Sequence, residues 1–304
     1  MNWWHLYAMV FGSGLIACLV TTPICRKIAT RIDLMDRPQG EAHKGHGKAT
    51  PLLGGLALFL GWAGCLGVGY LMVATGWASS FSQALENYRD GFFTVGFRAV
   101  FLVAGAAGAM VLGLVDDRRG MKAGTKFFWQ FVIALTVVWG GEIRITLFIA
   151  NAALNWSITI FWFMLLMNAI NFFDNMDGLA VGTAAIAFAF FAVTAGWQEQ
   201  YFIAALSALS CGAACGFWWY NRTPASIFMG DSGSHFLGYL LAAISASVTY
   251  YSSHSTTWLP VLLPLFILAL PLFDALAVVV IRTRQRKPFW IGDHNHISHR
   301  FVKM

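Results

Sequence analysis

The sequence predicts an all-α protein, a polytopic bundle of about nine transmembrane helices with the N-terminus outside and the C-terminus in the cytoplasm. Three observations lead to this prediction: the composition, the repeated apolar runs and the uneven distribution of basic residues. Of the 304 residues, 58% are hydrophobic and 11% charged, and the mean hydropathy is +0.63. A water-soluble domain of this length needs far more polar surface. We therefore treat residues 1–304 as a single integral-membrane domain.

Apolar runs of about 18 or more residues are long enough to cross about 30 Å of hydrocarbon. Nine runs in the sequence reach or approach this length, and we find no internal repeat among them. The fourth run is followed by residues 140–156, which are too few for another crossing and are interpreted as an external excursion. The predicted spans are residues 3–25, 52–75, 97–115, 126–141, 157–172, 179–196, 201–220, 233–250 and 258–281.

Lysine and arginine fall almost entirely on one side of this layout. With an external N-terminus, 17 of the 20 basic residues lie in cytoplasmic segments, and only Arg89, Arg98 and Arg144 lie outside. The positive-inside rule therefore gives the orientation and favours an odd number of spans. Topology and attraction to anionic membrane lipids account for the net charge of +6. Because the basic residues are scattered among membrane loops, we expect no nucleic-acid partner.

Aspartate is concentrated on the same side, although topology does not require it. Acidic residues contribute little to orientation, and ionisable side chains at the edge of a membrane span are candidates for a functional site. This pattern predicts a shared polar site at the cytoplasmic face. Eight of the ten aspartates lie in the predicted cytoplasmic segments: Asp33, Asp36, Asp116, Asp117, Asp174, Asp177, Asp231 and Asp293.

Five of these aspartates, in three segments, allow a local interpretation. Asp116 and Asp117 end a span, either as a simple polar stop or as a pair whose repulsion raises one pKa unless a cation neutralises it. On a helix, the i, i+3 spacing of Asp174 and Asp177 would put both carboxylates on one face, whereas an Asp-Gly pair alone is an ordinary turn. Asp231 precedes a span, where backbone amides at a helix start could receive an anion such as phosphate.

A carboxylate-rich site at a membrane face is typical of Mg²⁺, which keeps several waters and bridges substrate phosphates. We expect Mg²⁺, with Mn²⁺ as the alternative ion. The C-terminal segment adds His294, His296 and His299 after a basic run. These histidines could bind a transition metal, contact phosphate or act as acids and bases near pH 7. Their spacing is equally compatible with a surface cluster.

Four segments, taken in order, carry a family resemblance. They are DRP…HKGHGKATPLLGG at 36–55, VDDRRGMKAGTKFFWQ at 115–130, NAINFFDNMDGLAVG at 168–182 and FMGDSGSHFLG at 228–238. Each is similar to a motif of the polyprenyl-phosphate N-acetylhexosamine-1-phosphate transferases (glycosyltransferase family 4), which include the GlcNAc-1-phosphate and phospho-MurNAc-pentapeptide transferases of bacterial envelope synthesis. The resemblance extends from about residue 33 to residue 301. One such motif would be weak, whereas four in order are specific.

The resemblance implies a reaction and a set of catalytic residues. An oxygen of undecaprenyl phosphate would attack the β-phosphate of a UDP-sugar, with UDP-GlcNAc as first choice, releasing UMP and leaving a lipid-linked sugar pyrophosphate. Mg²⁺ would bind Asp231 with support from Asp117. Asp116 would accept the proton of the lipid phosphate or help to hold the metal, and a covalent aspartyl-phosphate on Asp116 is the rival mechanism. His296 and His299 would contact the sugar or the pyrophosphate.

The resemblance also implies a set of substrate-binding residues. Basic side chains of the first two motifs would neutralise phosphates, and the polar residues of the third would hold the nucleotide. The residues that match are Lys44, His46 and Lys126 for the phosphates, and Asn168, Asn171, Asp174 and Asp177 for the nucleotide. The expected location is the bacterial cytoplasmic membrane, with a UDP-N-acetylhexosamine, undecaprenyl phosphate and membrane lipids as partners and a homodimer as one allowed assembly.

Two departures and three alternatives accompany the resemblance. Ser298 stands at the middle histidine of the family's C-terminal motif, which argues against the pentapeptide branch. The chain ends at Met304, where relatives usually continue with at least one further span, so the resemblance leaves two interpretations open: a short member of the family or a truncated sequence that lacks a final span. The alternatives are the pentapeptide transferase itself, a non-catalytic membrane relative and an ion-coupled transporter. A transporter would be expected to show repeat symmetry and carboxylates near the bilayer midplane.

Overall fold

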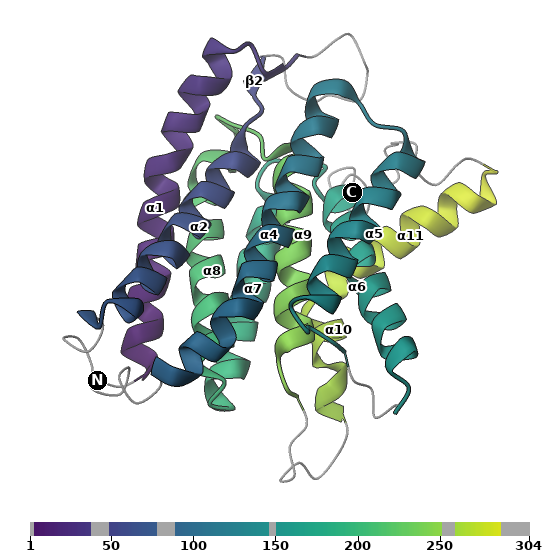
Figure 1. Cartoon of the computed structure of the whole chain (residues 1–304). Helices are drawn as coiled ribbons and strands as arrows, with labels where there is room; N and C mark the ends of the chain where they lie inside the picture. Colours follow the sequence, from purple (N-terminus) through teal and green to yellow (C-terminus); the bar gives the residue numbers. More distant parts are fainter. Residues whose placement is uncertain (1–2, 38–48, 78–88, 146–149, 251–258, 287–304) are drawn as a thin grey trace.

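The computed structural model has a nearly all-α architecture, as the sequence predicts (Figure 1). It describes residues 3–37, 49–77, 89–145, 150–250 and 259–286, without the side chains of residues 89–95. The elements are α1 (Trp3–Arg31), β1 (Met35–Asp36), β2 (Thr50–Pro51), α2 (Gly54–Ala74), α4 (Arg89–Arg119), α5 (Ala123–Trp139), α6 (Ala152–Phe173), α7 (Leu179–Trp197), α8 (Tyr201–Asn221), α9 (Gly230–Ser247), η2 (Leu259–Leu262), α10 (Leu263–Ile267) and α11 (Ala269–Arg284).

Each of the nine predicted spans falls on a helical segment, but the segments are not equivalent. Of the described helices, six are long and apolar enough to cross a membrane, namely α1, α2, α4, α6, α7 and α8. The bent pair of η2–α10 and α11 could form a seventh, and α5 is apolar but only 17 residues long. The chain is therefore a multi-pass membrane protein. The count of nine spans and the orientation remain predictions.

The last predicted span, residues 258–281, is wrong as a single helix. The chain bends by 70° between Ile267 and Ala269, where α10 ends and α11 begins. Pro271 lies in the first turn of α11 and has no N–H to donate to the carbonyl of Ile267, so an unbroken helix through this point would lose a hydrogen bond. The apolar composition predicted the segment correctly but could not show the bend.

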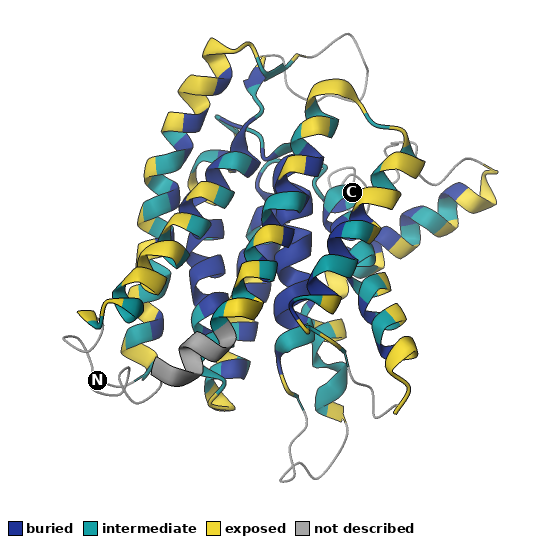
Figure 2. Cartoon of the chain, in the orientation of Figure 1, coloured by how far each residue is buried: buried dark blue, intermediate teal, exposed yellow. Residues whose placement is uncertain are grey.

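The centre of the bundle is α9, which lies among α2, α4 and α6 and is buried along almost its whole length (Figure 2). Glycines allow the neighbouring helices to approach it closely. A Cβ at Gly113 of α4 would collide with the backbone at Asp231, and one at Gly55 of α2 would collide with the backbone at Gly233. Small residues play this role in membrane helix packing generally. Because protein surrounds α9, its first turns can be polar.

Most of the exposed basic side chains of the described residues gather at one end of the bundle. The end where α4 finishes and α5 begins, which we call the basic end, carries Arg31, Arg118, Arg119, Lys122 and Arg222. At the opposite end of the helices, exposed tryptophans mark the boundary: Trp4, Trp77, Trp139 and Trp197. Tryptophans of this kind are enriched at membrane–water interfaces. The acidic residues of the sequence motifs lie at the basic end.

Candidate active site

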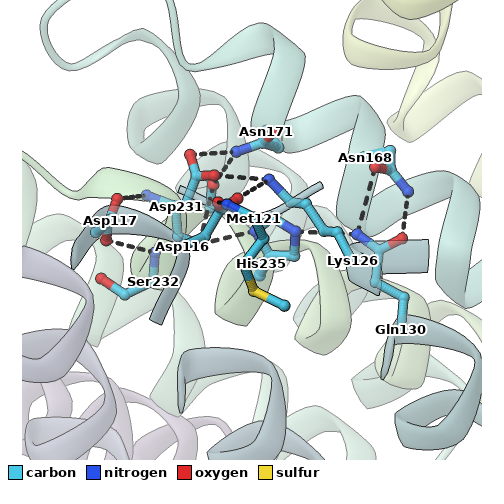
Figure 3. Close-up of polar contacts among 11 residues, drawn as sticks. Asp116, Asp117, Met121, Lys126, Gln130, Asn168, Asn171, Asp231, Ser232 and His235 are labelled. Carbon is cyan, nitrogen blue, oxygen red and sulfur yellow. Dashed lines mark hydrogen bonds and ion pairs between the residues drawn. The ribbon is translucent and has the colours of Figure 1, made fainter. Parts of the chain in front are cut away.

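Four segments meet at the basic end and bring the predicted polar residues together (Figure 3). The end of α4, the start of α5, the end of α6 and the start of α9 each contribute at least one side chain. Six predicted residues form one hydrogen-bonded site: Asp116, Asp117, Lys126, Asn168, Asn171 and Asp231. Segments more than 100 residues apart in the sequence thus converge on one site.

Lys126 is the cation at the centre of this site. Its Nζ lies 2.6 Å from Oδ2 of Asp116 and 2.6 Å from Oδ2 of Asp231. The amide of Asn171 donates from Nδ2 to Oδ1 of Asp231 at 2.8 Å and to Oγ of Ser234 at 2.9 Å. One oxygen of Asp231 therefore faces a cation, while the other accepts from a neutral amide. Lys126 is only 16% exposed, so water screens these ion pairs weakly.

Asp117 has a different environment from its neighbour. Its carboxylate accepts the backbone N–H groups of Asp231 (2.8 Å) and Ser232 (3.1 Å), and thereby caps the start of α9. Gly230 allows this contact with a positive φ of 66°, and a Cβ there would lie 2.6 Å from Oδ2 of Asp117. The expectation that these amides receive a substrate anion is corrected, because Asp117 supplies the negative charge that a helix start favours.

Asp116 is held from the other side. The backbone N–H of Met121 donates to its Oδ1 at 2.6 Å, across a turn in which Gly120 has φ of 63°. The two adjacent carboxylates therefore bind different partners, and Lys126 is the cation that neutralises Asp116. Of the two interpretations of this pair, the charged pair with its neutralising cation is the one observed.

Asp174 and Asp177 do not share a helix face, because α6 ends at Phe173 and α7 begins only at Leu179. Gly178, which follows Asp177 and precedes α7, has a positive φ of 73° and turns the chain between the two helices. Oδ2 of Asp177 accepts the N–H of Ala225 at 2.9 Å, which fixes the loop that leads into α9. The turn interpretation of Asp177 is thus correct, and the shared helix face is wrong.

Asp174 carries the least compensated charge of the site. Within the described part of the chain, its side chain makes no hydrogen bond, although Asp231, Asp117 and Asp177 are close enough to repel it. Burial, followed by these three carboxylates, raises the pKa of Asp174 to about 8. A positive charge placed near Asp174 would therefore offset both the burial of its carboxylate and the repulsion by its neighbours.

The capacity for a metal ion follows from this charge balance. No three His, Cys, Asp or Glu side chains of the described ranges converge as a closed metal site. Lys126 nevertheless pairs with only two of the four nearby carboxylates, Asp116 and Asp231, whereas Asp174 is repelled by Asp231 and Asp117. Mg²⁺ is commonly bound by one or two protein carboxylates together with substrate phosphates and water. Asp231 could serve as the ligand of such an open site, with Asp117 orienting the helix turn that carries it.

Two further residues that contact this site, Gln130 and His235, were not in our predicted set of site residues, although Gln130 matches the second motif downstream of Lys126. Both are fully buried, and their Nε2 atoms lie 2.9 Å apart. Gln130 follows Lys126 by four residues, and His235 follows Asp231 by four, so helical periodicity would have placed each on the face of a predicted residue. The other predicted residues, Lys44, His46, His296 and His299, lie outside the described residues.

Comparison with known proteins defines the class of this site. Residues 99–249 match the sequence pattern of glycosyl transferase family 4. A probable undecaprenyl-phosphate N-acetylglucosaminyl 1-phosphate transferase of Bacillus subtilis is 32% identical over 301 residues, which cover 97% of this chain and 76% of that protein. A decaprenyl-phosphate N-acetylglucosaminephosphotransferase of Mycobacterium tuberculosis is 34% identical, with 96% of this chain and 75% of that protein covered.

A phospho-N-acetylmuramoyl-pentapeptide-transferase of Geobacillus thermodenitrificans is 30% identical, with 79% of this chain and 75% of that protein covered. The site and these similarities define a membrane transferase of the polyprenyl-phosphate sugar-1-phosphate kind. The chain belongs to glycosyl transferase family 4, and the resemblance drawn from its four motifs is confirmed.

Proposed function

We propose that the chain transfers an N-acetylhexosamine 1-phosphate, with GlcNAc-1-phosphate as first choice, from a UDP-sugar to undecaprenyl phosphate. The products are UMP and a lipid-linked sugar pyrophosphate used in bacterial envelope synthesis. The observation that carries the proposal is the cluster in which Lys126 bridges Asp116 and Asp231 at the basic end of a membrane bundle. The GlcNAc preference is supported by the two GlcNAc-type relatives, because each matches nearly the whole chain.

Phosphoryl transfer requires chiefly the positioning of two phosphates and the neutralisation of their charge. Lys126 supplies a fixed positive charge, and the amide of Asn171 holds the second oxygen of Asp231. Mg²⁺, bound through Asp231, would supply the remaining positive charge. This divalent ion would also offset the repulsion that Asp174 now experiences.

Asp116 is the residue best suited to receive a proton from the acceptor. Its Oδ2 contacts Lys126 and its Oδ1 accepts from the backbone of Met121, so the carboxylate is held in one orientation. A phosphate monoester has a second pKa near 6, so at neutral pH the acceptor is already mostly ionised and the base contributes little. In the proposed reaction, the phosphate oxygen of the lipid attacks directly. The aspartyl-phosphate route would require Asp116 to leave Lys126.

An apolar groove offers a lipid-borne phosphate access to this cluster. The groove has a volume of about 510 Å³, lies between α4 and α5, and reaches Met121, whose N–H donates to Asp116. Val115 and Trp129 are among the residues that line it. An isoprenoid chain could remain in hydrocarbon beside these side chains while its phosphate approached Asp116, so the acceptor would not have to leave the bilayer.

Phospho-MurNAc-pentapeptide transfer is the second candidate. It is supported by relatives such as the Geobacillus thermodenitrificans protein, whose similarity covers less of this chain. The two candidates differ in the sugar donor and share the acceptor and the chemistry. A donor panel therefore separates them.

The test is release of UMP by the purified full chain in detergent. UDP-GlcNAc, UDP-GalNAc and UDP-MurNAc-pentapeptide are each supplied with and without undecaprenyl phosphate, and with Mg²⁺, Mn²⁺ or EDTA. We expect release to require lipid phosphate and the divalent ion, to be fastest with UDP-GlcNAc, and to be lost in Asp231→Asn. Asp33→Asn is the matched control. Asp33 is an exposed aspartate paired with Arg37, and it lies just after α1 at the basic end of the bundle.

Absence of UMP across the whole panel, from protein that still unfolds cooperatively on heating, would overturn the proposal. A longer relative assayed in parallel shows that the assay itself works. Silence limited to this chain would then favour the non-catalytic alternative. Release that is fastest with UDP-MurNAc-pentapeptide would instead establish the second candidate.

A further inference from the structure

Beneath the catalytic cluster lies a second, buried polar layer built from three of its four helices. It consists of Gln130 from α5, Asn168 from α6 and His235 from α9 (Figure 3). Gln130 and His235 are fully buried. Polar side chains this deep in a membrane bundle are costly unless every donor and acceptor is matched. The layer therefore requires a reason beyond packing.

The two layers correspond residue for residue. On α5 Gln130 follows Lys126 by four positions, and on α9 His235 follows Asp231 by four. The chain of α6 runs toward the basic end, so the deeper residue comes first there and Asn168 precedes Asn171 by three. A rise of 1.5 Å per residue puts each deeper residue about 4.5–6 Å below its partner. Each helix thus presents one residue to the catalytic cluster and one to the layer below.

Backbone carbonyls determine the direction of the hydrogen bonds from both ends of this layer. The carbonyl of Met164 can only accept, so it receives Nδ2 of Asn168 at 2.7 Å. The same Nδ2 donates to Oε1 of Gln130 at 2.7 Å, which turns Nε2 of Gln130 toward His235. Nε2 of His235 must therefore accept, at 2.9 Å, and carry no proton.

The other end gives the same answer independently. Nδ1 of His235 lies 2.8 Å from the carbonyl oxygen of Asp231, which can only accept, so Nδ1 carries the proton. A doubly protonated imidazole would set its second N–H against the N–H of Gln130. The chain of bonds therefore holds His235 as one neutral tautomer, and runs without a break from α6 through α5 to the helix turn that carries Asp231.

We propose that His235 is a positioning residue, which, with Gln130 and Asn168, fixes the relative height and rotation of the three helix turns that present Lys126, Asn171 and Asp231. It touches no reacting atom and acts through the backbone of Asp231. Without His235, the side chains of Asp231, Lys126 and Asn171 are all still present. The hydrogen bonds that fix their positions relative to one another are lost. The expected loss of kcat rests on the proposed function. The expected loosening of Lys126 and Asp231 rests on the geometry alone.

The test compares two buried residues of α9 in the full chain. His235→Phe removes both bonds of the imidazole at similar volume. Tyr239→Phe, one turn deeper and also fully buried, is the matched control, because it removes one bond to a backbone carbonyl, that of Leu102 at 3.1 Å, outside the layer. UMP release, the thermal unfolding midpoint and the acylation rate of Lys126, followed by mass spectrometry, are measured for each.

For His235→Phe we expect kcat to fall by about 10–100-fold, the range seen when a supporting hydrogen bond behind a site is removed. Lys126 should be acylated faster than in the wild type, because its two carboxylate partners are held less firmly. Tyr239→Phe should lower the unfolding midpoint and leave kcat and Lys126 acylation unchanged. Gln130→Met breaks the same layer from α5, and the double variant with His235→Phe should be no worse than the poorer single variant.

The inference is overturned if His235→Phe and Gln130→Met lower the unfolding midpoint but keep wild-type kcat and wild-type acylation of Lys126. Additive losses of kcat in the double variant would also contradict a single connected layer. If His235→Phe fails to fold, the kcat and Lys126 acylation rate of Gln130→Met test the inference. If the wild type releases no UMP, the proposed function fails, while the acylation rates still decide whether the layer holds Lys126 and Asp231 together.

Discussion

The two acidic pairs of this protein, Asp116 with Asp117 and Asp174 with Asp177, share a division of roles. In each pair the second carboxylate binds backbone amides: Asp117 caps α9, and Asp177 holds the loop before it. The first carboxylate of each pair, Asp116 or Asp174, makes no such cap or loop contact and belongs to the candidate active site. The pairs differ in that Asp116 has a cation 2.6 Å away, whereas Asp174 has no hydrogen-bond partner among the described residues.

This difference shows that the same residue type at similar spacing can serve structure or chemistry according to its partner. A carboxylate that accepts two amides contributes to stability and is poorly placed to receive a proton. A carboxylate paired with a lysine is held in one orientation. A bound cation would compensate the charge of a carboxylate that has neither partner among the described residues. Variants of the four residues should therefore separate activity from stability.

Among the four residues of the two pairs, the largest effect is expected for Asp116→Asn. The change removes the negative charge that holds Lys126 on one side, and a displaced Lys126 would neutralise less charge in the transition state, so kcat for UMP release should fall by about 10²–10³-fold. The unfolding midpoint should change little, because the amide oxygen can still accept from Met121. Steady-state kinetics with saturating lipid phosphate checks this, with Asp33→Asn as the control. A drop of less than about threefold would show that Asp116 is dispensable.

Asp117→Asn should affect stability more than its neighbour does. One atom of the new amide can accept from α9, but the other is a donor that faces a backbone N–H, so one buried amide loses its partner. The expected cost is about 1–3 kcal/mol of unfolding free energy. Thermal unfolding in detergent measures it against Asp116→Asn. If the two variants unfolded at the same temperature, the division of roles within this pair would be wrong.

Asp177→Ala should produce a smaller change of the same kind. It removes one hydrogen bond, to the N–H of Ala225, worth about 1 kcal/mol at a partly exposed site. The loop before α9 should loosen, and KM for the UDP-sugar should rise more than kcat falls. Titration of the donor at fixed lipid phosphate separates the two parameters. A pure loss of kcat would place Asp177 in the chemistry instead.

The smallest effect is a pH dependence of stability that belongs to Asp174. Because its pKa is raised to about 8 in the folded state, the neutral carboxyl favours folding fully below about pH 4, and this contribution is lost as the pH rises toward 8. The metal-free wild type should lose this contribution to stability between about pH 4 and pH 8, and Asp174→Asn should lose less. Parallel melting curves in EDTA give the difference. Mg²⁺ should also flatten the wild-type curve if it binds nearby.

Sequence reasoning recovered much of the site because helical periodicity and motif order act locally. All six of the predicted residues that meet in one hydrogen-bonded cluster lie at helix ends that the apolar runs had already marked. Gln130 and His235 lie one helical turn from Lys126 and Asp231, so periodicity marks their face, but the sequence does not show that they contact each other. Gln130 and His235 are 105 residues apart, and Gln130 and Asn168 are 38 residues apart along the chain.

The sequence by itself determined the membrane class, the helical segments, the side on which the acids gather and the family, since these depend on composition, periodicity and residue order. Only the tertiary structure decided which carboxylate does what. Asp116 and Asp117 are neighbours with identical side chains, and their roles separate because α5 brings Lys126 to one and α9 brings two amides to the other. Which partner another helix contributes depends on how the helices pack. Packing therefore gives two identical side chains different roles.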